Sequence, residues 1–377
     1  MSRRENFAKT IAHQQPDALT IDFGGNPLSC MEGKSMHNLL EYLGFDTSVR
    51  SHLFDMPQSV DERILKHFDT DTRAVGEIMF PHDSLHAKVS DTESIDAWGI
   101  RRAFTGMYWD IIEHPLKGAT IKDLENYRWP NPDSIDMNRI EAFAQKAKRL
   151  HDETDYVICV EHPVFGVFEL GCWMCGFDDF LMKMALDKPF VHKFFEIILE
   201  YQKKVIKKYY GALGKFAHYT SSGDDFATQT SLFLSPEMFR ELIMPYFKER
   251  IAYTKTFTDA PYLHHSCGSV VRIIDQLIKC GVDILNPIQP TATDMQPENL
   301  KAGFGDKIVF HGGIDTQDIL PFGTKESIEE SVKSTIEAMH QNGGYILAAA
   351  HNIQEDVPPQ NIVYMLEAAN RYGKWNM

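Results

Sequence analysis

The feature that most constrains the fold of this chain is a repeated alternation of short apolar segments with helical segments. The apolar segments predict β-strands at residues 18–23, 156–160, 216–220, 261–264, 283–285, 308–310 and 345–349. Helical periodicity follows several of them, at residues 189–209, 236–257, 269–280 and 325–341. Strands that alternate with helices form parallel β-α units. The repetition from about residue 156 to the end therefore predicts an α/β fold, a (β/α)8 TIM barrel.

We expect residues 1–377 to form a single barrel domain, because no Pro/Gly/Ser-rich linker marks a boundary. The region from about 25 to 150 is less regular. We interpret it as an N-terminal helical or irregular elaboration that covers part of the barrel. Chemistry in such barrels is carried by residues where the strands end. The polar residues at the predicted strand ends are therefore the candidates for function.

Composition limits the partners. A net charge of −15 argues against nucleic acid or an anionic membrane, because both attract basic surfaces. No apolar run approaches the roughly 20 residues that span a bilayer. The first residues are charged and lack the apolar segment of a signal peptide, so we expect a cytoplasmic protein.

The strongest chemical signal is the pair His265 and Cys267, which follows an apolar strand and precedes Gly268. Side chains two residues apart on an extended segment point to the same side, so both can reach one metal ion. His351 ends another predicted strand, and we predict a zinc site of these three residues with one open position. From spacing alone, a hydrogen-bonded histidine and a small buried thiol are equally good interpretations. His264 lies on the opposite face by alternation and is expected to pack or hydrogen-bond.

A second thiol pair, Cys172 and Cys175, is the competing metal or redox signal. The two residues share a helix face with apolar neighbours, and no second cysteine pair follows. A redox-active pair needs a helix N-terminus to stabilise the thiolate. We therefore interpret this pair as helix packing, and the remaining cysteines outside the His265 motif as structural.

Carboxylates and a further histidine also stand at strand ends. Asp224 and Asp225 can act as general acid or base, orient a ligand, or supply the fourth metal ligand. The alternative is that they cap a following helix. Glu161 and His162 present a similar choice, and all four are kept as catalytic candidates.

Three further side chains are candidates for substrate binding. Gln289 and His311 follow predicted strands, and two glycines after His311 allow a ligand to approach the backbone closely. His264 is the third, if it faces the site rather than the core.

These residues belong to segments that together resemble the uroporphyrinogen decarboxylase superfamily, specifically its cobalamin-dependent methyltransferase branch. The resemblance covers nearly the whole chain and implies the same (β/α)8 barrel. The carrying segments are residues 15–25, 223–229, 235–239, 264–270, 286–290, 311–315 and 350–359.

In the methyltransferases a His-x-Cys pair and a later Cys hold zinc. Here His265 and Cys267 match the pair, and His351 stands where the family has the later Cys. A neutral imidazole in place of a thiolate leaves zinc more electrophilic, which favours polarising a neutral oxygen over activating a thiol. The resemblance therefore implies an O-demethylase component of anaerobic one-carbon metabolism. It would transfer methyl from a small methoxylated, aromatic substrate to cobalamin on a separate corrinoid protein.

Two other enzymes and one binding protein are the alternatives. A methylcorrinoid:thiol methyltransferase would use the same site, and a carrier or sensor would bind ligand without methyl transfer. The decarboxylase of the family meets its polyanionic substrate with an arginine-containing N-terminal segment, whereas residues 24–29 here contain no arginine. Oligomeric state is open, with a homodimer as one option.

Overall fold

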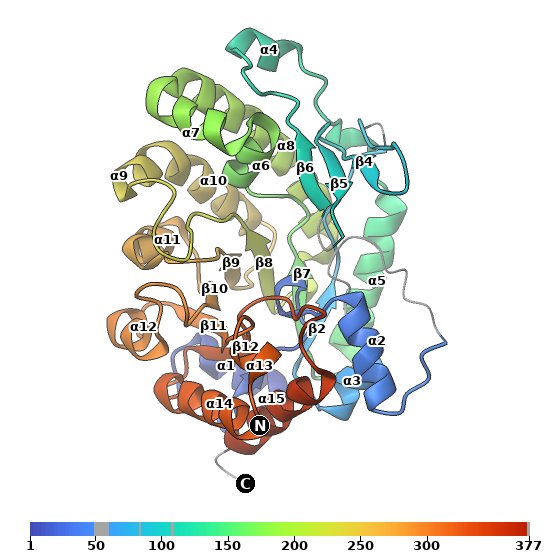
Figure 1. The fold of residues 1–377 in the computed structure, drawn as a ribbon, viewed down its shortest axis with the longest axis vertical. Helices are drawn as coiled ribbons and strands as arrows, with labels where there is room; N and C mark the ends of the chain where they lie inside the picture. Colours follow the sequence, from blue (N-terminus) through green and yellow to red (C-terminus); the bar gives the residue numbers. More distant parts are fainter. Residues whose placement is uncertain (49–59, 83, 107–108, 375–377) are drawn as a thin grey trace.

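Eight parallel strands form the central sheet of the protein, which is described here from a computed structural model over residues 1–48, 60–82, 84–106 and 109–374. The strands follow the order β1-β12-β11-β10-β9-β8-β7-β2 and curve into a nearly closed barrel inside a layer of helices (Figure 1). This architecture confirms the predicted (β/α)8 TIM barrel. The strands are β1 (Thr20–Ile21), β2 (Thr72–Val75), β7 (Val157–Glu161), β8 (Tyr219–Gly223), β9 (Tyr262–His265), β10 (Ile284–Ile288), β11 (Val309–Ile314) and β12 (Tyr345–Ala349).

Among the eight barrel strands, β2 is the one that the sequence pattern did not predict. Its Arg73 lies over the ring of Tyr156, 3.6 Å from the centroid, and donates to Glu62, so the segment reads as polar. Asp71, the residue before β2, connects this strand to β1. Its backbone N–H donates to the carbonyl of Ile21 at 3.1 Å. The N–H of Ile21 in turn donates to Oδ2 of Asp71 at 2.7 Å. One barrel strand thus comes from the region that we expected to be an elaboration.

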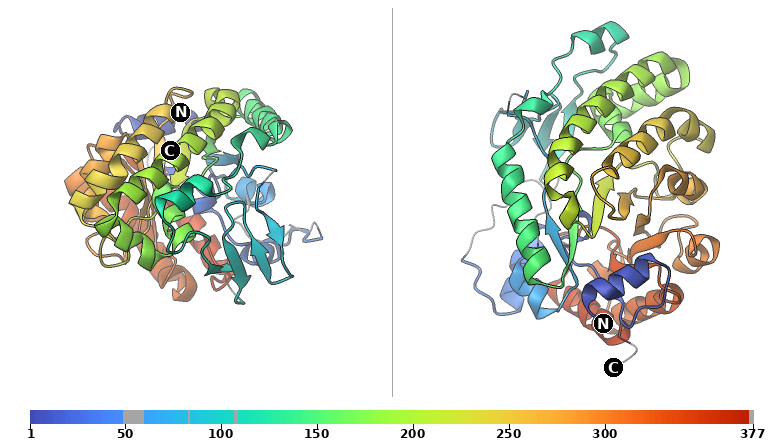
Figure 2. Two further views of the ribbon diagram at one scale, coloured as in Figure 1. Left: turned by 90° about the horizontal axis from the view of Figure 1, so that it is seen from above. Right: turned by 180° about the vertical axis from the view of Figure 1, so that it is seen from behind.

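The helices surround the sheet, and Figure 2 shows the two longest, α5 and α8, along its outside.

The predicted helix at 236–257 is divided, with one π-helical turn at Phe239–Ile243 before α10. Pro245 at the start of α10 has no N–H to complete an α-helical hydrogen bond, which accounts for the interruption. The helices are α1 (Arg3–Ile11), α2 (Gly33–Tyr42), α3 (Glu62–His67), α4 (Ile121–Asn126), α5 (Met137–Glu153), α6 (Val167–Cys175), α7 (Phe177–Leu186), α8 (Lys188–Leu213), α9 (Pro236–Met238), α10 (Met244–Thr254), α11 (Ile274–Cys280), α12 (Pro297–Phe304), α13 (Ile319–Phe322), α14 (Lys325–Met339) and α15 (Pro359–Tyr372).

A small antiparallel sheet lies in the N-terminal region that we expected to be helical or irregular. Its strands are β3 (Ala87–Lys88), β4 (Glu93–Ile95), β5 (Arg101–Phe104) and β6 (Trp109–Glu113), paired in chain order. The sheet lies beside α6 and α8 (Figure 1). Trp98 packs edge-on against Tyr201 of α8 at 4.8 Å, and Arg102 lies over Trp173 of α6.

The barrel interior changes from apolar to polar along the strands. Side chains at the strand starts, among them Leu263, Ile284 and Val309, pack with Phe7 of α1 in a separate apolar cluster. Side chains two residues further along a strand point to the same face. The next inward positions on β9, β10 and β11 are therefore His265, Asn286 and His311, all buried. Below the strand ends, the barrel is filled by polar groups rather than by a second apolar layer.

Candidate metal centre

Three potential metal ligands meet at the carboxyl ends of β9 and β12. His265 is the last residue of β9, Cys267 follows two residues later, and His351 follows β12. One ligand atom from each lies within 4.8 Å of the other two. The Nε2 of His265 is 3.2 Å from Sγ of Cys267, and the rings of His265 and His351 are 5.7 Å apart. The fold therefore brings His351 to the pair of His265 and Cys267, although His351 lies far from the pair in the chain.

Asp225 is the carboxylate nearest to this trio. Its Oδ1 accepts the backbone N–H of Cys267 at 2.8 Å and lies 3.6 Å from Nε2 of His265. Asp224 points elsewhere. It is fully buried, and its two oxygens accept the N–H groups of Phe168 and Glu169 at the start of α6. Asp224 therefore binds the start of α6, a helix that precedes it in the chain and not the following helix that we considered, whereas Asp225 faces the candidate site.

The electrostatic environment of the trio favours a cation. Burial, followed by the charges of Asp225 and Glu169, raises the pKa of Cys267, so the thiol stays protonated when no cation is present. Burial and the neighbouring His265 lower the pKa of His351 to about 4, so its imidazole is neutral at neutral pH. A divalent cation supplies the positive charge that a buried thiolate beside carboxylates needs. Neutral nitrogen and thiolate sulfur donors of this kind fit zinc.

The second ring nitrogen of His265 is held from inside the barrel. Its Nδ1 lies 2.5 Å from Oδ1 of Asn286, which leaves Nε2 facing Cys267. Nδ2 of Asn286 lies 2.6 Å from Nδ1 of His311, whose Nε2 lies 2.7 Å from Oδ2 of Asp22. His311, a predicted substrate-binding residue, is therefore fully buried beneath the trio instead of lining the mouth of the barrel.

Gln289 supports the loop that carries Cys267. Its Oε1 accepts the N–H of Gly268 at 2.9 Å. Gly268 has a φ of 82°, and a Cβ there would lie 2.3 Å from the carbonyl oxygen of Thr228, so only glycine fits without a shift of the backbone. The predicted substrate-binding residue Gln289 thus has a structural partner in the loop.

Two predicted site histidines lie on the outer face of the barrel wall. His264 packs against the rings of Phe226 and Phe247, and its Nδ1 is 3.1 Å from Oγ of Ser222. His162 packs against Tyr210 and Tyr262, away from the trio. The strand alternation that turns His265 inward necessarily turns His264 outward, and the same holds for Glu161 and His162. Their assignments as substrate-binding and catalytic residues are corrected accordingly.

Glu161 has the inward orientation that His162 lacks. Burial raises the pKa of Glu161 well above its usual range, and the charge of Glu77 adds to the shift. Glu169, which we did not predict, behaves similarly. Burial, Asp225 and Asp224 raise its pKa. A raised pKa favours the neutral carboxyl, which can donate a hydrogen bond.

Asn286 and Asp22 were also missed among the candidates. Both lie in segments that carried the family resemblance, but Asn is not a typical catalytic or zinc-binding residue type, and Asp22 lies within the predicted strand at residues 18–23 rather than at its end. The signal that could have identified Asn286 was its position two residues beyond Ile284, on the same strand face as His265 in the neighbouring strand.

The competing thiol pair is structural. Cys172 and Cys175 are buried in α6, and both are free thiols. Burial raises the pKa of Cys175 to about 12, which makes its thiolate inaccessible near neutral pH.

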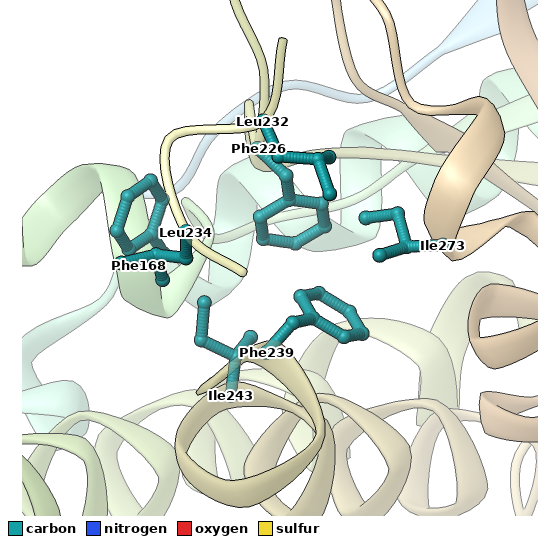
Figure 3. Close-up of a pocket in the computed structure, with 7 residues that line it drawn as sticks. All are labelled: Phe168, Phe226, Leu232, Leu234, Phe239, Ile243 and Ile273. Atoms are coloured by element: carbon teal, nitrogen blue, oxygen red, sulfur yellow. The ribbon is translucent and has the colours of Figure 1, made fainter. Parts of the chain in front are cut away.

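Apolar side chains hold the loop that follows Asp225. Figure 3 shows Phe226 pointing toward Phe239 and Ile273, with Phe168 on the other side of the same pocket. This packing anchors the backbone next to Asp225 from α6, the π-helical turn and the segment before α11. The complete lining is Phe168, Phe226, Leu232, Leu234, Phe239, Ile243 and Ile273.

A parallel eight-stranded barrel with a His-Cys-His cluster at the carboxyl ends of its strands defines a TIM-barrel protein with a candidate metal centre. The sequence matches the uroporphyrinogen decarboxylase (URO-D) family over residues 110–372. The chain belongs to this family, which confirms the predicted relationship.

Individual relatives are distant. The uroporphyrinogen decarboxylase of Geobacter sulfurreducens is 23% identical over 276 residues, covering 70% of this chain and 73% of that protein. The enzyme of Pseudoalteromonas atlantica is 29% identical over 76 residues, and the match spans 21% of its length. Among solved structures, a methyltransferase from Methanosarcina mazei superimposes with a TM-score of 0.65 at 13% identity, over 99% of both chains. At that identity the likeness establishes a shared fold.

Among the described residues, none of the helices combines the length and apolar character that crossing a membrane requires.

Proposed function

We propose that this protein is the zinc-dependent methyltransferase component of a corrinoid-dependent O-demethylase. The observation that carries the proposal is the convergence of His265, Cys267 and His351 at the carboxyl ends of the barrel strands. Family membership and the fold shared with the Methanosarcina mazei methyltransferase support it.

The donor set bears on the choice of substrate. His265 and His351 bring no charge as neutral imidazoles, and Cys267 brings one negative charge as a thiolate. His265, Cys267 and His351 would hold zinc, and the ion would supply Lewis-acid chemistry toward an ether oxygen. A site with two thiolates would be less electrophilic and better suited to activating a thiol.

The methyl group passes from the ether oxygen of a methoxylated aromatic substrate to cob(I)alamin on a separate corrinoid protein. The electron pair of the broken C–O bond stays on the oxygen, where charge develops in the transition state. Glu161 faces the barrel interior, and its neutral form, which burial favours, can donate its O–H to a substrate oxygen. Asp225 holds the Cys267 loop through the backbone N–H. The corrinoid partner would dock over the strand ends, where the three ligands lie.

Decarboxylation is the second candidate, because the curated relatives are uroporphyrinogen decarboxylases. The side chains beside the trio argue against it. Asp225 contacts His265 and the Cys267 loop, and Glu169 lies close to Asp225, so the trio is flanked by acidic groups, whereas a polycarboxylate substrate needs basic partners. Residues 24–29, where the decarboxylase has an arginine, instead donate hydrogen bonds to Asp22. The donors are the N–H of Gly25, the NH2 of Asn26 and the hydroxyl of Ser29.

Zinc content is the first test of the proposal. Purified wild type should contain about one zinc, largely lost in Cys267→Ala and His351→Ala. Cys280→Ala, at a buried thiol of α11, and His37→Ala, at an exposed histidine of α2, are the matched controls and should keep the metal. Wild type without zinc, or ligand variants that retain it, would contradict the site.

The reaction is tested next with cob(I)alamin and a panel of methoxylated aromatic compounds. Formation of methylcobalamin, read from its absorbance, is expected with zinc-loaded wild type and not with Cys267→Ala. Equal rates in zinc-free protein would exclude the mechanism. Methyl transfer from methylcobalamin to a thiol, or consumption of a porphyrinogen, would assign the alternatives instead.

A further inference from the structure

A continuous hydrogen-bonded path leads from the candidate metal centre into the barrel. It runs from His265 through Asn286 and His311 to Asp22, over contacts of 2.5, 2.6 and 2.7 Å. Asn286 and His311 have no exposed surface, and Asp22 is 1% exposed. The path joins β9, β10 and β11 to the segment after β1, and it accounts for the polar layer above the apolar base of the barrel.

The direction of the hydrogen bonds is set at Asp22. Both oxygens of Asp22 are surrounded by donors, because they accept from the N–H of Gly25, the NH2 of Asn26 and the hydroxyl of Ser29. Asp22 is therefore a carboxylate, which only accepts. Its oxygens also accept from Thr72 and Tyr219. Nε2 of His311 must accordingly donate.

The donor and acceptor in each hydrogen bond between His311 and the metal centre follow from this. Nδ2 of Asn286 lies 2.6 Å from Nδ1 of His311, and because an amide NH2 only donates, Nδ1 of His311 accepts there. The oxygen of Asn286 then faces His265 and accepts from its Nδ1–H. This leaves Nε2 of His265 without a proton, on the side of Cys267. The opposite end agrees, because Nε2 of His265 faces Sγ of Cys267 across 3.2 Å.

We propose that Asn286, His311 and Asp22 are positioning residues that hold His265 in the Nδ1–H tautomer and so make Nε2 its metal-binding atom. The inference rests on the metal site of the proposed function and extends it from three ligands to the residues that prepare one of them. A metal-binding histidine needs one unprotonated nitrogen, and the partner of the other nitrogen decides which one that is. Asn286 thus links a buried carboxylate to the metal centre without carrying charge itself.

The tautomer can be measured directly in the metal-free protein. Long-range ¹H–¹⁵N NMR of protein labelled at histidine reports which ring nitrogen carries the proton. The signals of His265 are identified by their absence in His265→Gln. Wild type should show Nδ1–H at His265 and Nε2–H at His311. Nε2–H at His265, or a doubly protonated His311, would overturn the proposal without any variant of the path.

Variants separate positioning from general stability. Asn286→Leu removes the acceptor, and we expect a mixture of His265 tautomers and zinc affinity that falls roughly ten- to a hundredfold. Asn286→Asp keeps an acceptor oxygen and should restore the Nδ1–H tautomer. Tyr345→Phe removes a buried barrel hydrogen bond to the carbonyl of Gly312, off the path, and should change neither readout.

The outcomes distinguish this inference from the proposed function. Wild type that shows Nδ1–H but binds no zinc would contradict the metal site and leave the path standing. If Asn286→Leu binds zinc as tightly as wild type and keeps the Nδ1–H tautomer of His265, the positioning role is overturned and the metal site stands.

Discussion

The carboxylate of Asp225 and the backbone N–H of Cys267 form a 2.8 Å hydrogen bond that joins the loop after β8 to the loop after β9. The same Oδ1 lies 3.6 Å from Nε2 of His265. Asp225 therefore contacts both residues of the His-x-Cys pair, one through the backbone and one through the side chain. It can hold the loop in place or approach the metal itself, and these two roles depend on different properties of the group.

Substitution of Asp225 separates the two roles. Asp225→Ala loses both the acceptor and the charge, and we expect zinc affinity to fall roughly ten- to a hundredfold. Asp225→Asn keeps an oxygen for the N–H of Cys267, so its loss should be smaller. Competition with a chromophoric chelator measures both, with Asp259→Asn at an exposed position as the control. Equal affinity in wild type and Asp225→Ala would exclude either role.

Zinc binding should release protons. Because burial and nearby carboxylates raise the pKa of Cys267, its thiol must lose a proton when it binds zinc. His351, with a pKa lowered to about 4, has no proton to release near neutral pH. We therefore expect about one proton per zinc at about pH 8. Calorimetry in buffers of different ionisation enthalpy gives this number, and a value near zero would mean that Cys267 is not a ligand.

Closure of the barrel beside β1 should depend on Asp71. Asp71→Ala leaves the N–H of Ile21 without its side-chain acceptor, and we expect a loss of about 1–3 kcal/mol in the free energy of unfolding. Burial raises the pKa of Asp71 to about 7, so a large share of the folded molecules carries the uncharged form near neutral pH. Asp71→Asn keeps an acceptor without charge and should lose less than the alanine variant. Denaturant unfolding near neutral pH compares them, and equal stability of all three proteins would contradict this role.

Acid sensitivity of the fold should depend in part on His218. Its Nδ1 accepts the N–H of Ile158 at 3.1 Å, and burial, with smaller effects of Arg4 and His151, lowers its pKa to about 4. The unfolded chain therefore binds a proton at this residue below about pH 6.5, whereas the folded chain does not until about pH 4. The free energy of unfolding should fall as the pH is lowered through this window.

His218→Asn offers an oxygen to the same N–H and cannot be protonated there. Its unfolding free energy, measured in urea from about pH 7 to about pH 4.5, should decline less steeply than that of wild type. The exposed substitution His37→Asn serves as the control and should leave the slope unchanged. Parallel curves for wild type and His218→Asn would show that this histidine is not a source of the acid sensitivity.

Strand periodicity made much of the fold predictable, and it failed where the pattern was short or polar. The seven predicted strands correspond to β1 and β7–β12, whereas β2 was hidden by its outward Arg73. The antiparallel sheet β3–β6 was missed for a similar reason, since its strands have two to five residues and no fully buried positions. Short strands of this kind form because neighbours in the tertiary structure pair with them, and their own sequence carries little signal.

The sequence by itself determined that parallel strands alternate with helices and that His265 and Cys267 face one way, because both follow from the local geometry of the backbone. Only the tertiary structure decided that His351 joins them and that Asp225, not Asp224, contacts the pair. It also decided that Asn286, His311 and Asp22 lie in line beneath His265. These relationships depend on the register between strands and on closure of the barrel, which bring residues far apart in the chain to one level of its interior.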